Sequence, residues 1–582
     1  MRSLRISICQ FNFTVGDIKG NILKIKEGIK RALDEKSDIA VFPELAVTGY
    51  PPEDLVFKPQ FIDNSIKAMD SLADFSKNKK ILIIAGYIFR DTASGNIFNS
   101  AGIVYNGRLA DIYNKIYLPN YGVFDEQRYF SPGVCLPVYL YRDVRIGVNI
   151  CEDIWYPTGP LHYQSSAMNA EVIINISASP FHAGKQDFRE NMFSTRAGDE
   201  SVILVNCNLV GGQDELVFDG FSTVYDEDGN LISRMDGFKE DFASIDIDAD
   251  SVFRKRLKDI RRKQERENMS GPFKLMSMNI GEVKYNPKRP PVNKGTLTIR
   301  KSNIADIYDA LTLGTRDYVN KNGFDKVIVA ISGGIDSALV ATIAADALGQ
   351  ERVKGIFLPS IFSASISGED ARELSRNLSI ELLELSIQDI FGLYSSKLSE
   401  IFRGKPPGVA EENIQSRIRG NIVMAISNKF GWLVLTTGNK SEMSTGYATL
   451  YGDMAGGFAV IKDVLKTTVY QLAEYRNGIN QVIPRRIIER APSAELRADQ
   501  KDSDTLPEYT ILDRIITAYV EQDRPVDEII FEMGDGKLVR KVIAMIDKSE
   551  YKRRQSPPGI KITPRAFGRD RRMPITNGLR NS

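Results

Sequence analysis

The sequence contains 582 residues, of which 42% are hydrophobic and 26% are charged, and its formal net charge is +1. A single hydrophobic core stops growing at roughly 250 to 300 residues, so we expect two or three domains. The near-zero net charge excludes a bulk electrostatic attraction to nucleic acid or to anionic membranes. No stretch approaches the roughly 18 apolar residues of a membrane span. The composition is that of an ordinary soluble globular protein.

The first residues, MRSLRISICQFNF, alternate like a half-buried strand and lack the apolar region and cleavage site of a secretory signal. We therefore expect the protein to be cytoplasmic. The cysteines Cys9, Cys135, Cys151 and Cys207 show no C-x-x-C spacing, which predicts neither a disulfide framework nor a zinc site.

Residues 1–253 contain many short apolar strands separated by helical or loop segments. The predicted strands include RISICQF, IAVFPE, ILIIAGY, RIGVNI, VIINIS and VILVNC. Asn106-Gly107 and Asp228-Gly229 each separate two β-rich runs, and an x-Gly pair in this position is typical of a hairpin turn. The pattern predicts an α/β domain with mixed strands.

The next two regions differ sharply in composition. Residues 254–296 are rich in Lys, Arg and Pro, and we interpret them as a solvated helix with an extended linker rather than a polyanion-binding segment. In residues 297–582, long helices alternate with the single strands VIVAI, VKGIFLP, ELLEL and WLVLTTG. Regular alternation of this kind predicts a doubly wound parallel sheet.

The stretch VIVAISGGIDSA runs from a predicted strand through a glycine-rich loop into a helix. Gly333 and Gly334 allow backbone N–H groups to approach an anion, and the positive end of the helix lies at the same place. Ser332 and Ser337 add hydroxyl donors, and Asp336 offers a carboxylate for Mg²⁺. The loop lacks the lysine of the G-x-x-x-x-G-K-[ST] motif. It therefore predicts a Mg²⁺-assisted pyrophosphate site of another type.

This loop resembles that of the N-type ATP pyrophosphatases, which split ATP between the α- and β-phosphates to adenylylate a substrate. Further stretches are similar to the NAD synthetase branch of that family: EENIQSRIRGNIVMAISN, TTGNKSEMSTGYATLYGDMAGGFAVIKDVLK and RAPSAEL. The resemblance implies that Asp336 and Glu442 bind Mg²⁺ and that Ser493 lies near the ATP phosphates. It also implies that the following residues lie around deamido-NAD and ATP: Asn413, Arg417, Asp453 and Lys466.

An adenylylated carboxylate becomes an amide only when ammonia attacks it, and ammonia in neutral water is almost entirely ammonium. A thiol that hydrolyses glutamine through a thioester would supply ammonia locally. A catalytic N-terminal cysteine is excluded because Arg2 follows Met1, and neither of the two histidines lies in a recognisable glutaminase pattern. The sequence therefore favours a carboxylate base with a lysine partner.

Three stretches, VFPELAVTGYPPEDL, YNKIYLPNYGVFDEQRYF and NICEDIW, together resemble the Glu-Lys-Cys triad of the nitrilase superfamily. The resemblance implies that Glu44 is the general base, Lys115 holds the oxyanion and Cys151 is the nucleophile. Glu126 stands at the position of the auxiliary acid. Positions that line the glutamine pocket in glutamine-dependent members match Tyr121, Trp155, Ser179 and Lys185.

Together the two resemblances imply an N-terminal nitrilase-like α-β-β-α sandwich in residues 1–253, a linker in 254–296 and an ATP pyrophosphatase domain in 297–582. The implied reaction converts deamido-NAD, ATP and glutamine to NAD, AMP, pyrophosphate and glutamate. Ammonia would travel along an enclosed path, and the chain would form a homo-oligomer.

Two alternatives remain open at this point. Another amidotransferase with the same loop, making GMP or an amino-acid amide, would share S-G-G-I-D-S, although YGDMAGGF argues against it. A non-enzymatic nucleotide-sensing scaffold would keep the fold but tolerate loss of either catalytic set. The tail KITPRAFGRDRRMPITNGLR carries five arginines, and we interpret it as a strap over a neighbouring domain or subunit rather than a nucleotide site.

Overall fold

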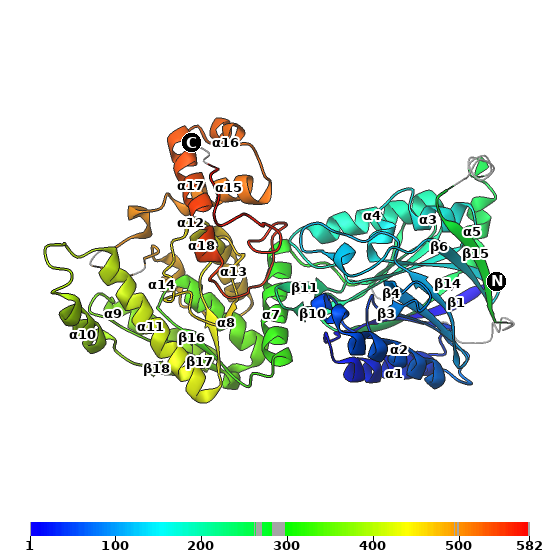
Figure 1. Ribbon diagram of the computed structural model, residues 1–582, viewed down its shortest axis with the longest axis horizontal. Helices are drawn as coiled ribbons and strands as arrows, with labels where there is room; N and C mark the ends of the chain where they lie inside the picture. Colours follow the sequence, from blue (N-terminus) through cyan, green and yellow to red (C-terminus); the bar gives the residue numbers. More distant parts are fainter. Residues whose placement is uncertain are drawn as a thin grey trace. The chain divides into compact units, whose positions relative to one another are not determined.

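The computed structural model describes residues 2–260, 262, 271–281, 297–493, 495–497 and 500–579. The chain divides into two compact units (Figure 1). Unit 1 comprises Met1–Gln213 and Val217–Arg300, and unit 2 comprises Asp214–Leu216 and Lys301–Ser582.

Unit 1 is built on two β-sheets. Within the described residues, one sheet has six strands in the order β14-β1-β2-β3-β4-β5 and the other has seven in the order β13-β12-β9-β8-β7-β6-β15. The first consists of β1 (Ser3–Gln10), β2 (Ile39–Val41), β3 (Leu82–Arg90), β4 (Ile97–Tyr105), β5 (Arg108–Asn114) and β14 (Asp241–Asp248). The second consists of β6 (Cys135–Tyr141), β7 (Val144–Ile150), β8 (Val172–Ser177), β9 (Ile203–Asn208), β12 (Thr223–Tyr225), β13 (Leu231–Arg234) and β15 (Lys274–Gly281).

Helices cover the outer faces of the two sheets (Figure 1). The six-stranded sheet is covered by α1 (Ile18–Asp34) and α2 (Pro59–Phe75), and the seven-stranded sheet by α3 (Pro160–Ser166) and α4 (Lys185–Glu200). Helix α1 buries Ile22, Ile25 and Ile29, whose spacing places them on one helical face. Apolar side chains from both sheets form one buried cluster, which includes Ile6 and Val148. This arrangement confirms the predicted α-β-β-α sandwich.

The predicted hairpin turns are present. Asn106 (φ +48°) and Gly107 (φ +87°) join β4 to β5, and two positive φ angles are what a tight turn matched to the strand twist requires. Gly229, with φ +83°, lies in the turn between β12 and β13. A third hairpin is formed by β10 (Val210–Gln213) and β11 (Leu216–Asp219). Helix α5 (Ala249–Arg256) follows β14.

The charged stretch 254–296 is not a simple linker where the structure describes it. Much of the stretch lies outside the described residues, but β15 falls in its middle. This strand pairs in parallel with β6, starting from Lys274 opposite Cys135. The sequence analysis expected a solvated helix and extended chain here, so the strand is a difference from that expectation.

Unit 2 contains a parallel sheet in the order β18-β17-β16-β19-β20. Its strands are β16 (Val327–Ala330), β17 (Val353–Phe357), β18 (Glu381–Glu384), β19 (Leu433–Thr436) and β20 (Phe458–Ala459). The sheet confirms the predicted doubly wound architecture. After β18 the chain returns to the other side of β16, so the strand order reverses between β16 and β19. Ligand crevices in open parallel sheets lie at the carboxyl ends of the strands at such a point.

The helices of unit 2 surround this sheet and extend beyond it (Figure 1). They are α7 (Asn303–Lys321), α8 (Ile335–Leu348), α9 (Ser365–Leu378), α10 (Gln388–Leu398), α11 (Val409–Phe430), α12 (Lys440–Thr445), α13 (Lys466–Ile479), α14 (Arg485–Glu489), α15 (Tyr509–Ile516), α16 (Val526–Met533), α17 (Gly536–Lys548) and α18 (Glu550–Arg553). Among the residues that the structure describes, no helix has the length and apolar character needed to cross a membrane.

The C-terminal tail packs into unit 2. Lys440 is 0% exposed, and its Nζ lies 2.7 Å from Thr563 Oγ1 in the tail. The same ammonium lies 2.9 Å from Asp463 Oδ1 and 2.7 Å from Glu521 Oε1. Asp463 Oδ2 in turn accepts hydrogen bonds from the backbone N–H groups of Ile562 and Thr563. The tail is thus tied to its own unit through a buried ionic cluster.

Candidate active sites

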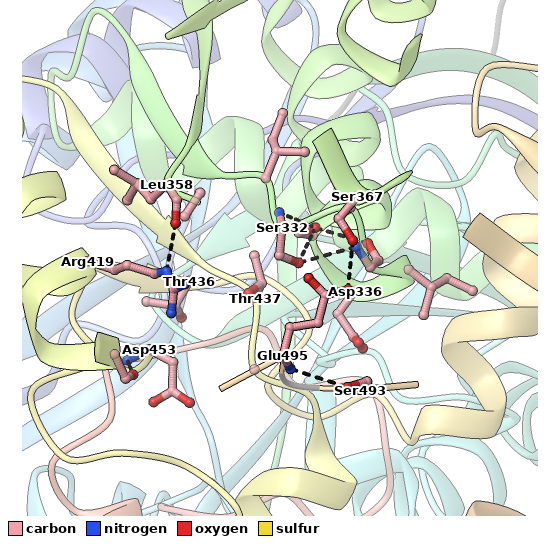
Figure 2. A pocket seen from close by; sticks show the side chains of 18 of the residues that line it. Ser332, Asp336, Leu358, Ser367, Arg419, Thr436, Thr437, Asp453, Ser493 and Glu495 are labelled. Carbon is pink, nitrogen blue, oxygen red and sulfur yellow. Dashed lines mark hydrogen bonds between the residues drawn. The ribbon is translucent and has the colours of Figure 1, made fainter. Parts of the chain in front are cut away.

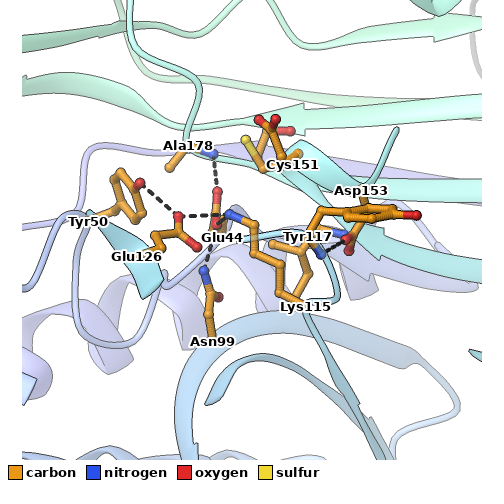
Figure 3. Close-up of polar contacts among 12 residues, drawn as sticks. Glu44, Tyr50, Asn99, Lys115, Tyr117, Glu126, Cys151, Asp153 and Ala178 are labelled. Atoms are coloured by element: carbon orange, nitrogen blue, oxygen red, sulfur yellow. Dashed lines mark hydrogen bonds and ion pairs between the residues drawn. The ribbon is translucent and has the colours of Figure 1, made fainter. Parts of the chain in front are cut away.

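Three candidate residues of unit 1 each follow directly or closely on a strand end. Glu44 comes after β2, Lys115 after β5 and Cys151 after β7. Lys115 Nζ lies 2.7 Å from Glu44 Oε1, and both residues are at most 1% exposed. Figure 3 shows Cys151 next to this pair. The fold therefore gathers the three residues that the sequence analysis placed in one triad.

Glu126 joins the same buried group. Its Oε1 lies 2.8 Å from Lys115 Nζ and accepts a hydrogen bond of 2.9 Å from Tyr50 Oη. Burial raises the pKa of Glu126 to about 7, against the opposing effect of Lys115. Burial disfavours the charged form of Lys115, but the carboxylates of Glu126 and Glu44 outweigh it and raise the pKa of the ammonium well above its ordinary value. Lys115 is therefore a permanent cation.

Two groups that the sequence did not identify hold the Glu44 carboxylate. Asn99 Nδ2 donates to Oε1 at 2.7 Å, and the Ala178 backbone N–H donates to Oε2 at 2.9 Å (Figure 3). Gly86 on β3 packs directly against the segment that carries Glu44, because a Cβ at position 86 would come within 2.1 Å of the Leu45 backbone nitrogen. The one available signal for Asn99 was the polar pair Asn99-Ser100 within the otherwise apolar run of β4.

Cys151 occupies a backbone conformation that side chains other than glycine rarely adopt. Its φ is +43°, at the junction between β7 and the short 3₁₀ helix Cys151–Ile154. Burial, and then the negative charge of Glu44, raise the pKa of the thiol far above its ordinary value. The thiol is therefore protonated at neutral pH, and a neighbouring base must remove its proton before the sulfur can act as a nucleophile.

Two of the predicted glutamine-binding residues, Ser179 and Lys185, lie together beside the base. Ser179 follows Ala178 directly and is buried, and its backbone N–H donates to Asn208 Oδ1 at 2.9 Å. Lys185 Nζ donates to the carbonyl of Pro180 at 2.8 Å. Because the Ala178 N–H donates to Glu44 Oε2, both predicted residues belong to or contact the segment after β8 that reaches the base.

The other two, Tyr121 and Trp155, lie on the nucleophile side. Tyr121 Oη donates to the carboxylate of Glu152 at 3.0 Å, and Glu152 is the neighbour of Cys151 in the chain. Trp155 stacks on Phe188, with 5.7 Å between ring centroids. Tyr121 is 59% exposed, so it stands at the surface of the site rather than inside it.

In unit 2, the S-G-G-I-D-S loop connects β16 to the start of α8 (Figure 2). Gly333 has φ +81°, and a Cβ there would come within 2.6 Å of the Ser367 carbonyl oxygen. Ser337 Oγ accepts from the Ser332 N–H at 3.1 Å and donates to the Gly334 carbonyl at 2.9 Å. The loop is thus fixed in a shape that only glycine permits at position 333, with the positive end of α8 beside it.

A lysine and two carboxylates meet at this loop. Lys466 Nζ forms an ion pair with Asp336 and lies 3.9 Å from Glu442 Oε1. Asn439 Nδ2 donates to Asp336 Oδ1 at 2.9 Å. Burial, and then the charge of Asp336, raise the pKa of Glu442 to about 8. A divalent cation bound between Asp336 and Glu442 would favour the ionised form of both carboxylates.

Asp336, Glu442 and Lys466 line one cavity of about 290 Å³. The predicted residues along it are Ser332, Gly333, Gly334, Asp336, Ser337, Glu442, Asp453, Lys466 and Ser493. Asn413 does not line this cavity but is connected to its wall through Thr449. The Thr449 hydroxyl donates to Asn413 Oδ1, and the Thr449 backbone N–H donates to Asp453 Oδ1, each at 2.8 Å. Arg417 lines a separate cavity with Tyr451.

Arg419, which the sequence analysis did not select, lines the loop cavity instead (Figure 2). Its Nε donates to the Leu358 carbonyl at 2.9 Å, and burial lowers the pKa of the guanidinium to about 10. Arg417 and Arg419 lie two residues apart on α11, and residues at that spacing do not share a helix face. The two arginines of this R-x-R pattern therefore line different cavities.

Comparisons with known proteins cover both units. A family model described as carbon-nitrogen hydrolase matches residues 5–256, and one described as NAD synthase matches residues 307–556. The chain is 46% identical to the glutamine-dependent NAD(+) synthetase of Thermotoga maritima and 44% identical to that of Aquifex aeolicus, in each case over 99% of both chains.

Solved structures agree with these matches. The structure of the glutamine-dependent NAD+ synthetase from Acinetobacter baumannii in complex with ADP is 38% identical in sequence, with a TM-score of 0.73 and full coverage of both chains. A glutamine-dependent NAD(+) synthetase from Cytophaga hutchinsonii, 21% identical, shares the fold with a TM-score of 0.76 over 99% of this chain and 98% of that one. The chain therefore belongs to the family of glutamine-dependent NAD(+) synthetases.

Proposed function

We propose that the chain converts deamido-NAD, ATP and glutamine to NAD, AMP, pyrophosphate and glutamate. The observation that carries the proposal is the Lys115 ammonium, held 2.7 Å from Glu44 and 2.8 Å from Glu126 beside Cys151. This is a nucleophile with a base and a fixed cation, which hydrolysis of an amide requires. The same chain carries a glycine-rich loop with a cavity in front of it.

In unit 1, the Cys151 thiol gives its proton to Glu44 as sulfur attacks the carboxamide carbon of glutamine. Oε2 is the oxygen suited to this role, because it accepts one hydrogen bond from Ala178, whereas Oε1 already accepts from both Lys115 and Asn99. Lys115 balances the negative oxygen of the tetrahedral intermediate.

Collapse of this intermediate breaks the C–N bond, and the proton on Glu44 passes to the leaving nitrogen, so ammonia departs and a thioester remains. Glu44 then takes a proton from water as the water oxygen attacks the thioester. Glutamate is released, and the proton returns to the Cys151 sulfur.

In unit 2, the nicotinate carboxylate of deamido-NAD attacks the α-phosphorus of ATP, and pyrophosphate leaves. The loop N–H groups and Ser332 hold phosphate oxygens, and Lys466 balances charge on the phosphates. Asp336 and Glu442 would hold Mg²⁺, since their oxygens are the donors this ion prefers; bound there, it would neutralise phosphate charge. Ammonia then attacks the acyl adenylate, forming the amide and releasing AMP.

Glutamine as substrate, Mg²⁺ as cofactor and a homo-oligomeric state are parts of this proposal that rest on the family resemblance, and a cytoplasmic location is a further part of it. Sedimentation of the purified protein tests the oligomeric state. Titration of Mg²⁺ into metal-free protein with ATP tests the cofactor.

The function is tested by comparing wild type with Cys151→Ala in the presence of ATP, Mg²⁺ and deamido-NAD, with either glutamine or ammonium as the nitrogen source. Wild type should form NAD from both sources, and the variant from ammonium alone. Use of glutamine by the variant would contradict the nucleophile assignment. Failure of wild type with both sources would contradict the synthetase assignment, and xanthosine monophosphate and aspartate would then be tried as acceptors.

A further inference from the structure

Asp153 is a buried carboxylate that the mechanism above does not use. It is 0% exposed and accepts four hydrogen bonds from the chain around it. Its Oδ1 accepts from the backbone N–H groups of Ile116 at 3.1 Å and Tyr117 at 2.9 Å. Its Oδ2 accepts from Tyr113 Oη at 2.7 Å and from the backbone N–H of Ile150 at 3.0 Å. Figure 3 shows Asp153 beside Tyr117.

The four donors belong to two segments that come from different sheets. Tyr113, Ile116 and Tyr117 flank Lys115 at the end of β5, whereas Ile150 directly precedes Cys151 at the end of β7. One carboxylate therefore connects the segment that carries the cation to the segment that carries the thiol. Displacement of either segment would change the distance between the Lys115 ammonium and the Cys151 sulfur.

We propose that Asp153 is a positioning residue that fixes the Cys151 thiol against Lys115. The proposal rests on the proposed function, in which Cys151 is the nucleophile. A second observation supports it: Cys151 has φ +43°, a conformation that is strained for a non-glycine residue and persists only where its surroundings hold it. Asp153 lies two residues further along the same 3₁₀ turn and anchors it at Ile150.

A carboxylate suits this role better than an amide of the same shape. Both oxygens of Asp153 accept two hydrogen bonds, so Asn would have to turn its NH₂ group toward two donors on one side. Either the two N–H groups beside Lys115 or the Ile150 N–H and the Tyr113 hydroxyl would then lose their acceptor. Burial raises the pKa of Asp153 to about 6, so the group remains ionised at neutral pH and can accept all four bonds.

The test compares Asp153→Asn with Asp38→Asn. Asp38 is also a buried acid of unit 1, where its Oδ2 accepts from the Arg5 backbone N–H at 2.7 Å, and no part has been assigned to it in the reaction. Both variants should lower the unfolding temperature. Only Asp153→Asn should lower kcat for glutamine hydrolysis, by about 100-fold with KM nearly unchanged, because a misplacement of about 1 Å costs this much.

The reactivity of the Cys151 thiol can be measured separately from the stability of the protein. Iodoacetamide labelling, followed by mass spectrometry of the Cys151 peptide, reports how readily the sulfur ionises beside Lys115. The labelling rate should fall about tenfold or more in Asp153→Asn and stay at the wild-type value in Asp38→Asn. NAD formation from ammonium should be retained in both variants. Wild-type kcat and labelling rate in a folded Asp153→Asn protein would overturn the proposal.

If Asp153→Asn does not fold, Tyr113→Phe decides the question, because it removes one of the four donors and leaves the carboxylate in place. It should lower kcat for glutamine hydrolysis about tenfold, the lower end of what one hydrogen bond to a charged group contributes, again with KM nearly unchanged. An unchanged kcat in Tyr113→Phe would also overturn the proposal. The proposed function fails separately, if Cys151→Ala keeps its glutamine-dependent activity.

Discussion

Both units place a lysine between two carboxylates, but the two clusters differ in their access to solvent. In unit 1, the side chains of Lys115, Glu44 and Glu126 are 1%, 0% and 5% exposed. In unit 2, Lys466 is also buried at 3%, whereas Asp336 and Glu442 are 17% and 20% exposed and face a cavity. In the closed cluster of unit 1, the three charged groups have almost no contact with solvent. In the open cluster of unit 2, the carboxylate oxygens of Asp336 and Glu442 remain accessible from the cavity.

The largest effect is expected from removing each lysine in turn. Lys115→Met would leave two buried carboxylates without their cation, so the free energy of unfolding should fall by about 3–5 kcal/mol. Lys466→Met leaves carboxylates that solvent can reach, and the loss should be about 1 kcal/mol. Urea denaturation of both variants measures the difference. Equal losses would contradict the view that solvent access makes the two clusters differ.

A second prediction separates the chemistry of the two clusters. Asp336→Asn should lower NAD formation from both glutamine and ammonium on the order of 100-fold, because charge stabilisation at the phosphates is lost. Glutamine hydrolysis should continue at the wild-type rate. Chelation of Mg²⁺ in the wild-type protein should give the same separation. Equal loss of both activities would contradict an independent role for Asp336.

The closed cluster should make the stability of the protein depend on pH. The pKa of Glu126 is about 7, against an ordinary value of 4.5, so the folded protein holds a proton that the unfolded chain has released between these values. This contribution to stability is full below about pH 4.5 and is lost as the pH rises through about 7. Glu126→Gln should remove a decline of about 1–3 kcal/mol over this interval. Denaturant unfolding at several pH values measures it, and an unaltered slope would refute the assignment.

The smallest effect is expected from Tyr50→Phe. The substitution deletes the hydrogen bond of 2.9 Å from Tyr50 Oη to Glu126 Oε1. Stability should fall by about 1 kcal/mol. Because that bond favours the ionised carboxylate, the pKa of Glu126 should rise further, and the stability decline should move to higher pH. A shift toward lower pH would contradict this account.

Features of the fold that depend on a few neighbouring residues could be predicted from the sequence, whereas features that depend on tertiary contacts could not. Apolar alternation predicted an α/β domain with mixed strands and a doubly wound parallel sheet, since periodicity acts over a few residues, whereas the α-β-β-α sandwich was implied by the resemblance to the nitrilase superfamily. Strand β15 was not predicted because only one of its residues, Ile280, is buried and the strand is held by backbone pairing to β6. The contacts of Asn99 with Glu44 and of Asp153 with Tyr113 join residues that are distant in the sequence, so no local pattern predicts them.

The contacts of the C-terminal tail also affect the order in which the parts of the protein can fold during synthesis. Ile562 and Thr563, which donate to Asp463, are added to the growing chain about 100 residues after Asp463. N-terminal units fold first during synthesis, so unit 1 can be complete while Asp463 still lacks these donors and Lys440 still lacks Thr563. A chain that ends early would carry a buried, under-bonded ionic cluster close to Glu442 and Lys466. Such a product would be recognised by cellular proteases.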